Sequence, residues 1–316
     1  MSSITPLELA ELAVGDPDEL NVHLHLVERD VVTSTGLKVK VHCHCLTVDA
    51  SGKIRLARLA EFMRDAIVDY AIPRSKREQA RARDAQFKST SAMTGLYHEA
   101  RATFTDLDQS GEGGELLLHL LAQRFLKLPQ VLCKMALKTD GRMHYHGADG
   151  VYASVDDDGV LKLFWGESKL YASASDAIRA CLQSIAPFLT EPDSQAAARD
   201  RDLVLLSDNA DLDDPKLTAA FKLYFDKTKK HSTRVRYAGV ALVGFDADFY
   251  PENDAEAVAD EIAQSAKAQV EKWVERVGAR LVEEKLEKCE IELFCLPLPS
   301  AEGFRKAFKT ALGLDA

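Results

Sequence analysis

Two spacings of apolar residues alternate along this chain, and together they predict a layered α/β fold. Residues 148–155 and 160–169 have the apolar, strand-like pattern of sheet segments. Residues 173–188 and 254–287 carry apolar side chains at helical spacing. The stripe of the last helix comprises Val258, Ile262, Ala266, Val270, Trp273, Val277 and Leu281. Because strands and helices are interleaved, we expect a sheet covered by helices, with Trp273 in the core.

The N-terminal third contains its own strand and helix signals. Residues 21–28 and 37–48 alternate between apolar and polar side chains around a turn-like segment, which predicts a β-hairpin. Residues 55–71 have helical spacing and end before Pro73. Residues 74–90 are nearly all polar, so we expect a solvated helix or a linker.

We expect two domains, with a boundary near residue 105. Residues 1–105 form an N-terminal α+β domain, for which we expect a role in partner docking, and residues 106–316 form the second domain. Within the second domain, residues 191–215 are rich in Asp, Ser and Pro and predict a loop insertion.

The overall charge argues against unaided binding of nucleic acid. Forty basic and fifty acidic residues give a net charge of -10, whereas phosphate binding depends on clustered Lys and Arg. Residues 222–236 are locally basic, with six basic residues, one acidic residue and two aromatic residues. This segment either follows a phosphate backbone, with its rings available for stacking, or forms a solvated connection.

Several features predict a cytoplasmic protein that does not cross a membrane. No run of 18 apolar residues is present, and the N-terminus lacks the basic and apolar regions of a secretory signal. The six cysteines have no disulfide-scaffold spacing, which suits a reducing compartment.

The segment GVLKLFWGESKL places Glu167 and Lys169 on one strand, where charged side chains are rare unless paired or metal-bound. The turn signal DDDG at 156–159 precedes this strand. If the turn centres on Asp158, residues whose numbers sum to 316 lie opposite each other. Asp149 then faces Glu167, and Lys169 shares their side of the sheet.

This grouping has two chemical interpretations. Two adjacent carboxylates repel each other, and Mg²⁺ removes the conflict while accepting phosphate oxygens of a substrate. A nearby lysine orients a metal-activated water, so the set matches metal-assisted phosphodiester hydrolysis. The alternative is a cross-strand salt bridge at the end of a sheet, with Asp149 as a turn residue.

Three segments, GGELLLHLL, HGADGVY and LFWGESKLY, resemble the PD-(D/E)XK nuclease superfamily. More narrowly, they resemble the HamA family, the nuclease subunits of the Hachiman anti-phage defence system. The match is close over residues 110–170, and the order of helix and strand also fits through the C-terminus. Ala148 replaces the proline of the superfamily motif. The resemblance implies a mixed central sheet flanked by helices.

The resemblance also implies roles for individual residues. Asp149 and Glu167 are expected to bind Mg²⁺, or Mn²⁺ in its place, with Glu115 as a further carboxylate from a helix. Lys169 is expected to position the attacking water. The implied partners are DNA and HamB, a superfamily 2 helicase that would supply the DNA affinity this acidic chain lacks.

We therefore expect a metal-dependent DNA endonuclease that acts with a helicase in phage defence. The alternative is a non-catalytic subunit with a nuclease fold, which binds DNA or the helicase and regulates it.

The histidines give secondary hypotheses. His119 lies one turn after Glu115 and is placed to orient it, while His144 and His146 precede Asp149 closely. A separate set in the first two strands either binds zinc or occupies ordinary strand positions, and the missing C-x-x-C pairs favour the second interpretation. This set comprises His23, His25, His42 and His44.

Overall fold

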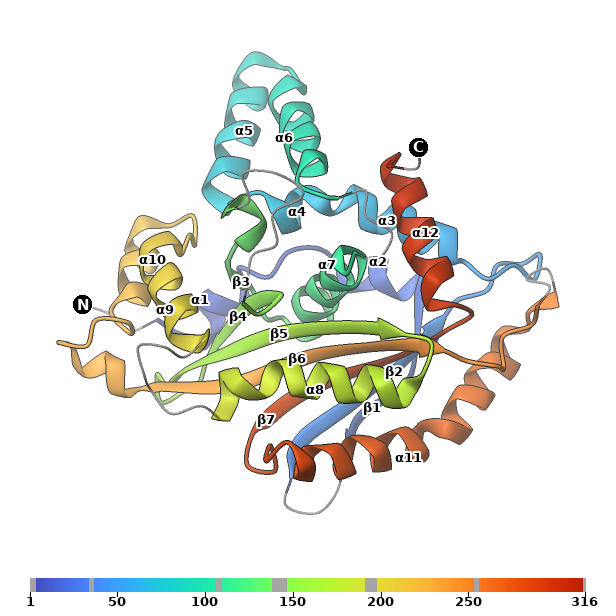
Figure 1. Cartoon of the computed structure of the whole chain (residues 1–316). Helices are drawn as coiled ribbons and strands as arrows, with labels where there is room; N and C mark the ends of the chain where they lie inside the picture. The colour runs from blue at the N-terminus through green and yellow to red at the C-terminus, as the bar shows by residue number, and fades with distance from the viewer. Residues whose placement is uncertain are drawn as a thin grey trace.

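A seven-stranded mixed sheet organises the protein, in the strand order β1-β2-β7-β6-β5-β4-β3 (Figure 1). The computed structural model describes residues 4–33, 37–105, 110–137, 147–190, 198–252 and 256–314. The strands are β1 Leu24–Val32, β2 Lys38–Leu46, β3 Gln130–Leu132, β4 Gly150–Val155, β5 Leu161–Tyr171, β6 Val235–Asp246 and β7 Glu290–Leu298. Strands β2, β7, β6 and β5 are parallel, whereas β1, β4 and β3 are antiparallel to their neighbours. The predicted mixed sheet is confirmed.

Helices cover both faces of this sheet. They are α1 Pro6–Ala10, α2 Pro17–Asn21, α3 Leu56–Asp65, α4 Ile67–Ala71, α5 Arg74–Phe87, α6 Ser91–Ala102, α7 Glu112–Leu120, α8 Ala174–Thr190, α9 Ala198–Asn209, α10 Pro215–Lys222, α11 Ala259–Glu283 and α12 Ala301–Leu312. A π-helical turn at Leu121–Phe125 extends α7, and short 3₁₀ turns occupy Lys134–Leu137 and Lys230–Thr233.

The alternation of side chains along β5 divides the core into two parts. Leu163 and Trp165 are buried on the face that α8 and α11 cover. Phe164 is buried on the opposite face, beneath α7 and α12 (Figure 1). Successive side chains of a strand point to opposite faces of the sheet. The nearly continuous apolar sequence of β5 therefore makes both of its faces apolar.

Several predicted elements are confirmed. Strands β1 and β2 form the N-terminal hairpin, although residues 34–36 of its turn lie outside the described residues. The stripe of the long helix is buried from Ile262 to Leu281, and Trp273 packs against Phe245 with ring centroids 5.0 Å apart. Val258 is the exception: it precedes α11 and is half exposed.

Two predictions of local structure are wrong. Residues 198–209 of the expected loop insertion form α9, whose Arg199, Asp202 and Leu206 are buried at helical spacing. The charges at two of these positions concealed the helical period. The helix expected over 55–71 breaks at Ala66, because α3 packs on α12 whereas α4 packs on α6 and α7.

The two sides of the boundary expected near residue 105 share the sheet. Strand β2 pairs with β7 over six residue pairs, from Lys38 with Glu290 to Cys43 with Cys295. Within the described ranges, no helix combines the length and the apolar character that a bilayer crossing requires.

Candidate metal centre

The β4–β5 hairpin places Asp149 beside the middle of β5. Gly150 pairs with Gly166 and Val151 with Trp165, which confirms the register expected from the turn. The ladder extends by one further bond, since the Asp149 N–H donates to the Gly166 carbonyl at 2.8 Å. This bond reaches the carbonyl one residue short of Glu167, and the described pairing ends at Gly150, so the position of Asp149 directly opposite Glu167 remains a prediction.

The Asp149 carboxylate is anchored by the residue between Glu167 and Lys169. Its Oδ2 accepts hydrogen bonds from the Ser168 N–H at 2.7 Å and from the Ser168 hydroxyl at 2.9 Å. Lys169 forms an ion pair with Glu167. Ser168 was not identified from the sequence, although its position inside the Glu-Ser-Lys motif was a signal for it.

Burial and mutual repulsion perturb the two carboxyl groups. Burial, followed by the charge of Asp149, raises the pKa of Glu167 to about 8. Burial also raises the pKa of Asp149, against the opposing effects of Lys169 and the Ser168 hydrogen bonds. Burial opposes the charge of Lys169, but Glu167 and Asp149 outweigh it and raise the pKa of the amine. Lys169 thus acts on both carboxylates, and Lys134 acts on Asp149 as well.

Helix α7 presents Glu115 from the opposite layer. Its Oε2 accepts a hydrogen bond from the Tyr70 hydroxyl of α4 at 3.0 Å. Burial, then the charge of Glu115 and more weakly that of Asp149, raises the pKa of Tyr70, which therefore remains a hydrogen-bond donor. Tyr70 is a residue of the N-terminal third that sequence reasoning missed, and nothing in its local pattern marked it.

A close approach between α7 and β5 makes this arrangement possible. At Gly114, a Cβ atom would lie 2.3 Å from Cδ1 of Leu170 and 3.2 Å from the Ser168 hydroxyl oxygen. A Cβ there would have to push the Leu170 side chain aside, so glycine gives the closest fit between α7 and β5. Gly114 therefore allows the helix that carries Glu115 to rest on the strand that carries Glu167.

The structure brings some of the predicted site residues into contact and leaves others apart. Asp149, Glu167 and Lys169 interact directly, whereas the oxygens of Glu115, Asp149 and Glu167 do not all lie within 4.8 Å of one another. His119 contacts Gln123 at 3.2 Å and packs against the rings of Tyr70 and Tyr152. His144 and His146 lie outside the described residues.

The donor set fits a hard divalent cation. Asp149 and Glu167 carry more negative charge than Lys169 offsets, and the second nearby ammonium, Lys134, is already paired with Asp202. Mg²⁺ and Mn²⁺ prefer oxygen ligands, and binding one would offset the charge of Asp149 that helps to raise the pKa of Glu167. Asp149 and Glu167 are the residues placed to hold such an ion, with Glu115 adjacent.

The four N-terminal histidines do not converge. His25 is exposed and faces Cys45 in the register, and His23 stacks on Phe62. His42 and His44 share a face of β2, where both pack against Phe125 and Phe294.

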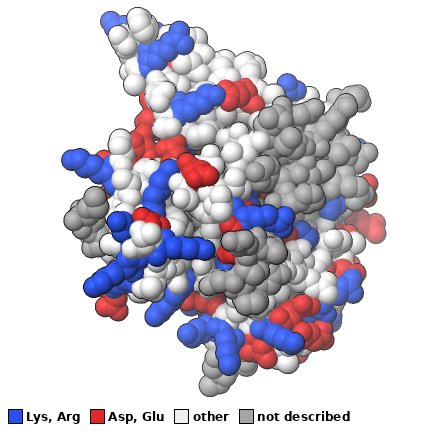
Figure 2. All heavy atoms as spheres, turned by 60° about the vertical axis from the view of Figure 1, so that its left-hand side comes forward, with Lys and Arg blue, Asp and Glu red and all other residues white. Residues whose placement is uncertain are grey.

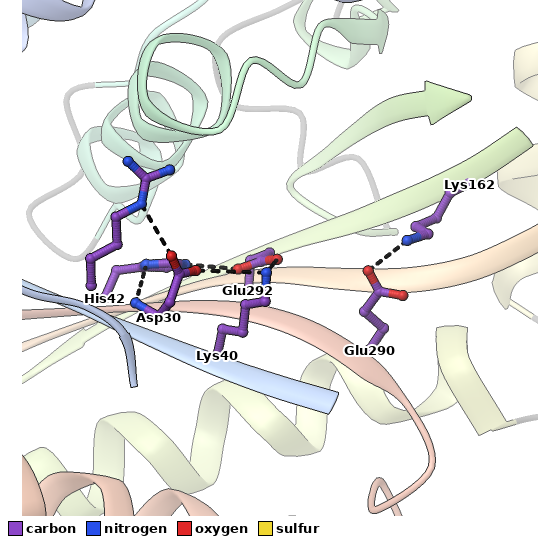
Figure 3. A network of polar contacts seen from close by, with 7 residues as sticks. Asp30, Lys40, His42, Lys162, Glu290 and Glu292 are labelled. Atoms are coloured by element: carbon purple, nitrogen blue, oxygen red, sulfur yellow. Dashed lines mark hydrogen bonds and ion pairs between the residues drawn. The ribbon is translucent and has the colours of Figure 1, made fainter. Parts of the chain in front are cut away.

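His42 instead belongs to a polar network that we call the histidine network, made of Asp30, Lys40, His42 and Glu292 (Figure 3). Of the ligand groups in the described parts of the chain, Asp30, His42 and Glu292 alone bring three donor atoms within 4.8 Å. His42 Nδ1 accepts the Asp30 N–H at 3.3 Å, so Nε2 carries the proton and donates to Glu292 at 2.7 Å. A nitrogen that carries a proton cannot coordinate a metal, which argues for an ordinary polar contact.

The basic segment 222–236 lies at the other end of β5. The Tyr224 hydroxyl donates to the Gly159 carbonyl at 3.0 Å, and Arg234 contacts the Asp158 carbonyl. Figure 2, which turns the side of α9 and α10 forward, shows Lys and Arg side chains gathered on part of this face, with Asp and Glu interspersed. Residues 222–236 thus contact the turn of the β4–β5 hairpin, whereas Glu167 lies farther along β5.

Comparison with known proteins supports the resemblance seen in the sequence. No curated protein is significantly similar to this chain. The HamA family model, in contrast, matches residues 21–312 and so includes the whole sheet and the carboxylate site. This protein therefore belongs to the HamA family.

Proposed function

We propose that this protein is a metal-dependent DNA endonuclease. The observation that carries the proposal is the closeness of two carboxylates at the β4–β5 hairpin: Ser168 binds Asp149, whose charge raises the pKa of Glu167, and Glu167 is paired with Lys169. Such a site stores negative charge that a divalent cation would stabilise. If Lys169 served only in a structural ion pair, one carboxylate would be enough to pair with it.

Each residue has a role in hydrolysis of a phosphodiester. Asp149 and Glu167 would hold Mg²⁺ or Mn²⁺, which supplies a more acidic water and charge stabilisation at the phosphate. Lys169, adjacent to Glu167, orients the attacking water and stabilises the developing negative charge. Ser168 fixes the Asp149 carboxylate, and Tyr70 fixes Glu115.

Membership of the HamA family supports a role in Hachiman anti-phage defence. We propose that the helicase HamB is the partner that delivers DNA. A net charge of -10 disfavours unaided DNA binding, so activity should depend on a partner that holds the substrate. The segment 222–236 is the local surface best suited to contact a backbone phosphate.

Cleavage assays test this proposal directly. Plasmid and linear DNA are incubated with Mg²⁺ and the protein, alone and with the helicase and ATP. Activity that disappears in a Glu167→Ala/Lys169→Ala protein supports the endonuclease, and dependence on the helicase locates the DNA affinity. If no condition gives cleavage and the variant behaves like the parent, the protein is instead a regulatory subunit with a nuclease fold.

A further inference from the structure

A buried ion pair lies directly behind Asp149. Lys134, in the 3₁₀ turn after β3, places its Nζ 2.7 Å from Oδ2 of Asp202 on α9. Lys134 is 6% exposed and Asp202 is 1% exposed. Lysine and aspartate are rarely buried this deeply, and a buried pair is often no more stabilising than apolar residues of the same size. Stability alone therefore gives little reason for it.

The pair holds one particular peptide group. Lys134 Nζ also donates to the carbonyl of Ala148 at 2.8 Å. That carbonyl belongs to the same peptide group as the N–H of Asp149, which donates to the Gly166 carbonyl at 2.8 Å. Both ends of the peptide plane are thus fixed, one by Lys134 and the other by β5. Because this plane precedes the Asp149 Cα atom, it sets the direction in which the carboxylate leaves the chain.

The residue before this peptide group is adapted to the contact. Gly147 has a φ of +145°, a conformation that favours glycine. A Cβ atom there would lie 2.5 Å from Lys134 Nζ and 2.9 Å from Oδ1 of Asp202. The chain therefore passes directly against the ion pair on its way to Asp149.

We propose that Lys134 and Asp202 are positioning residues that hold Asp149 in the orientation needed to bind the metal. This inference rests on the proposed function. Asp202 neutralises Lys134, so the pair orients the carboxylate without adding net charge beside a cation site. Residues behind a metal ligand commonly change metal affinity about 10- to 100-fold when they are removed.

The informative variant is Lys134→Met/Asp202→Leu, which replaces the pair with apolar side chains and leaves the net charge unchanged. Mn²⁺ binding is measured by isothermal titration calorimetry, and folding by thermal unfolding. We expect a melting temperature near that of the parent and a Mn²⁺ affinity about 10- to 100-fold lower. Lys162→Met/Glu290→Leu is the matched control, since Lys162 Nζ lies 2.6 Å from Glu290 near the other end of β5 (Figure 3).

The outcomes separate this inference from the proposed function. If the Lys134/Asp202 variant and its control both bind Mn²⁺ like the parent, while Glu167→Gln does not, the positioning inference fails and the metal site stands. A parent protein that binds no Mn²⁺ overturns both. If the double variant unfolds, the milder neutral pair Lys134→Met/Asp202→Asn decides, because it removes the donor to the Ala148 carbonyl: a folded protein with lowered Mn²⁺ affinity supports positioning, and full affinity argues against it.

Discussion

The carboxylate site and the histidine network are two groups of charged residues on the same sheet, and they differ in how their charges are balanced. In the histidine network, Arg29 and Lys40 contact Asp30, Lys40 also reaches Glu292, and His42 donates to Glu292. In the carboxylate site, Lys169 pairs with Glu167, and Lys134 near Asp149 is already paired with Asp202, so both carboxyl groups keep raised pKa values. The histidine network brings its ligand atoms closest together. The carboxylate site, in contrast, carries negative charge that Lys169 does not fully offset. For this reason the proposed cation site is the carboxylate site, where negative charge exceeds positive charge, and not the histidine network, where ligand atoms lie closest together.

Metal binding should distinguish the two groups most strongly. We expect Asp149→Asn and Glu167→Gln each to lower Mn²⁺ affinity by at least about 100-fold, because each removes a ligand with its charge. Glu292→Gln should leave the affinity unchanged. Isothermal titration calorimetry with Mn²⁺ measures all three. Lost binding in Glu292→Gln, with binding retained in Glu167→Gln, would move the metal to the histidine network.

The pH dependence of stability should depend on the carboxylate site. Burial and the charge of Asp149 raise the pKa of Glu167 to about 8. Between about pH 4.5 and 8 the folded state therefore binds more protons than the unfolded state, and stability falls as the pH rises. The effect is on the order of a few kcal/mol. Thermal unfolding in EDTA from pH 5 to 8 should show this slope in the parent and a flatter one in Glu167→Gln.

Addition of metal refines this experiment. A divalent cation binds the ionised carboxylates, so Mg²⁺ should stabilise the parent more at pH 8 than at pH 5. Identical pH profiles for the parent and Glu167→Gln, with or without Mg²⁺, would be incompatible with a strained pair of carboxylates.

The histidine network should contribute to stability and not to cleavage. Glu292→Gln removes the charged acceptor of buried His42 and should lower the free energy of unfolding by about 1 to 3 kcal/mol. Replacing both residues, with His42→Leu/Glu292→Met, should recover part of that loss because no buried imidazole is left without its charged acceptor, although the Asp30 N–H loses its own acceptor. Urea denaturation measures both. If the double variant is less stable than Glu292→Gln, the histidine network stabilises the fold by more than the pairing of its buried polar groups.

The smallest effect is expected for the Lys162–Glu290 pair. Both side chains are partly exposed, at 24% and 35%, so solvent screens their attraction. Lys162→Met should change the free energy of unfolding by less than about 1 kcal/mol, and neither cleavage nor Mn²⁺ binding should change. A large loss of activity would instead assign this end of β5 to the substrate-binding surface.

The sequence by itself determined the local features of the site. The apolar pattern identified β4 and β5, and the DDDG turn fixed their register. Since side chains alternate along a strand, this register predicts that Asp149 lies opposite Glu167 and that Lys169 lies on the same side. Local pattern also identified the long helix α11 and the burial of Trp273.

Tertiary structure alone decided which distant residues complete the site. Tyr70 meets Glu115 across 45 positions, and Lys134 meets Asp202 across 68. His42 finds Glu292 across 250 positions. Such contacts depend on how helices pack on the sheet and on the order of its strands, and no local spacing encodes either. Asp202 also lies in a segment whose charges concealed a helix, because the partners of its buried polar face, Lys134 for Asp202 and the Phe188 carbonyl for Arg199, come from other parts of the fold.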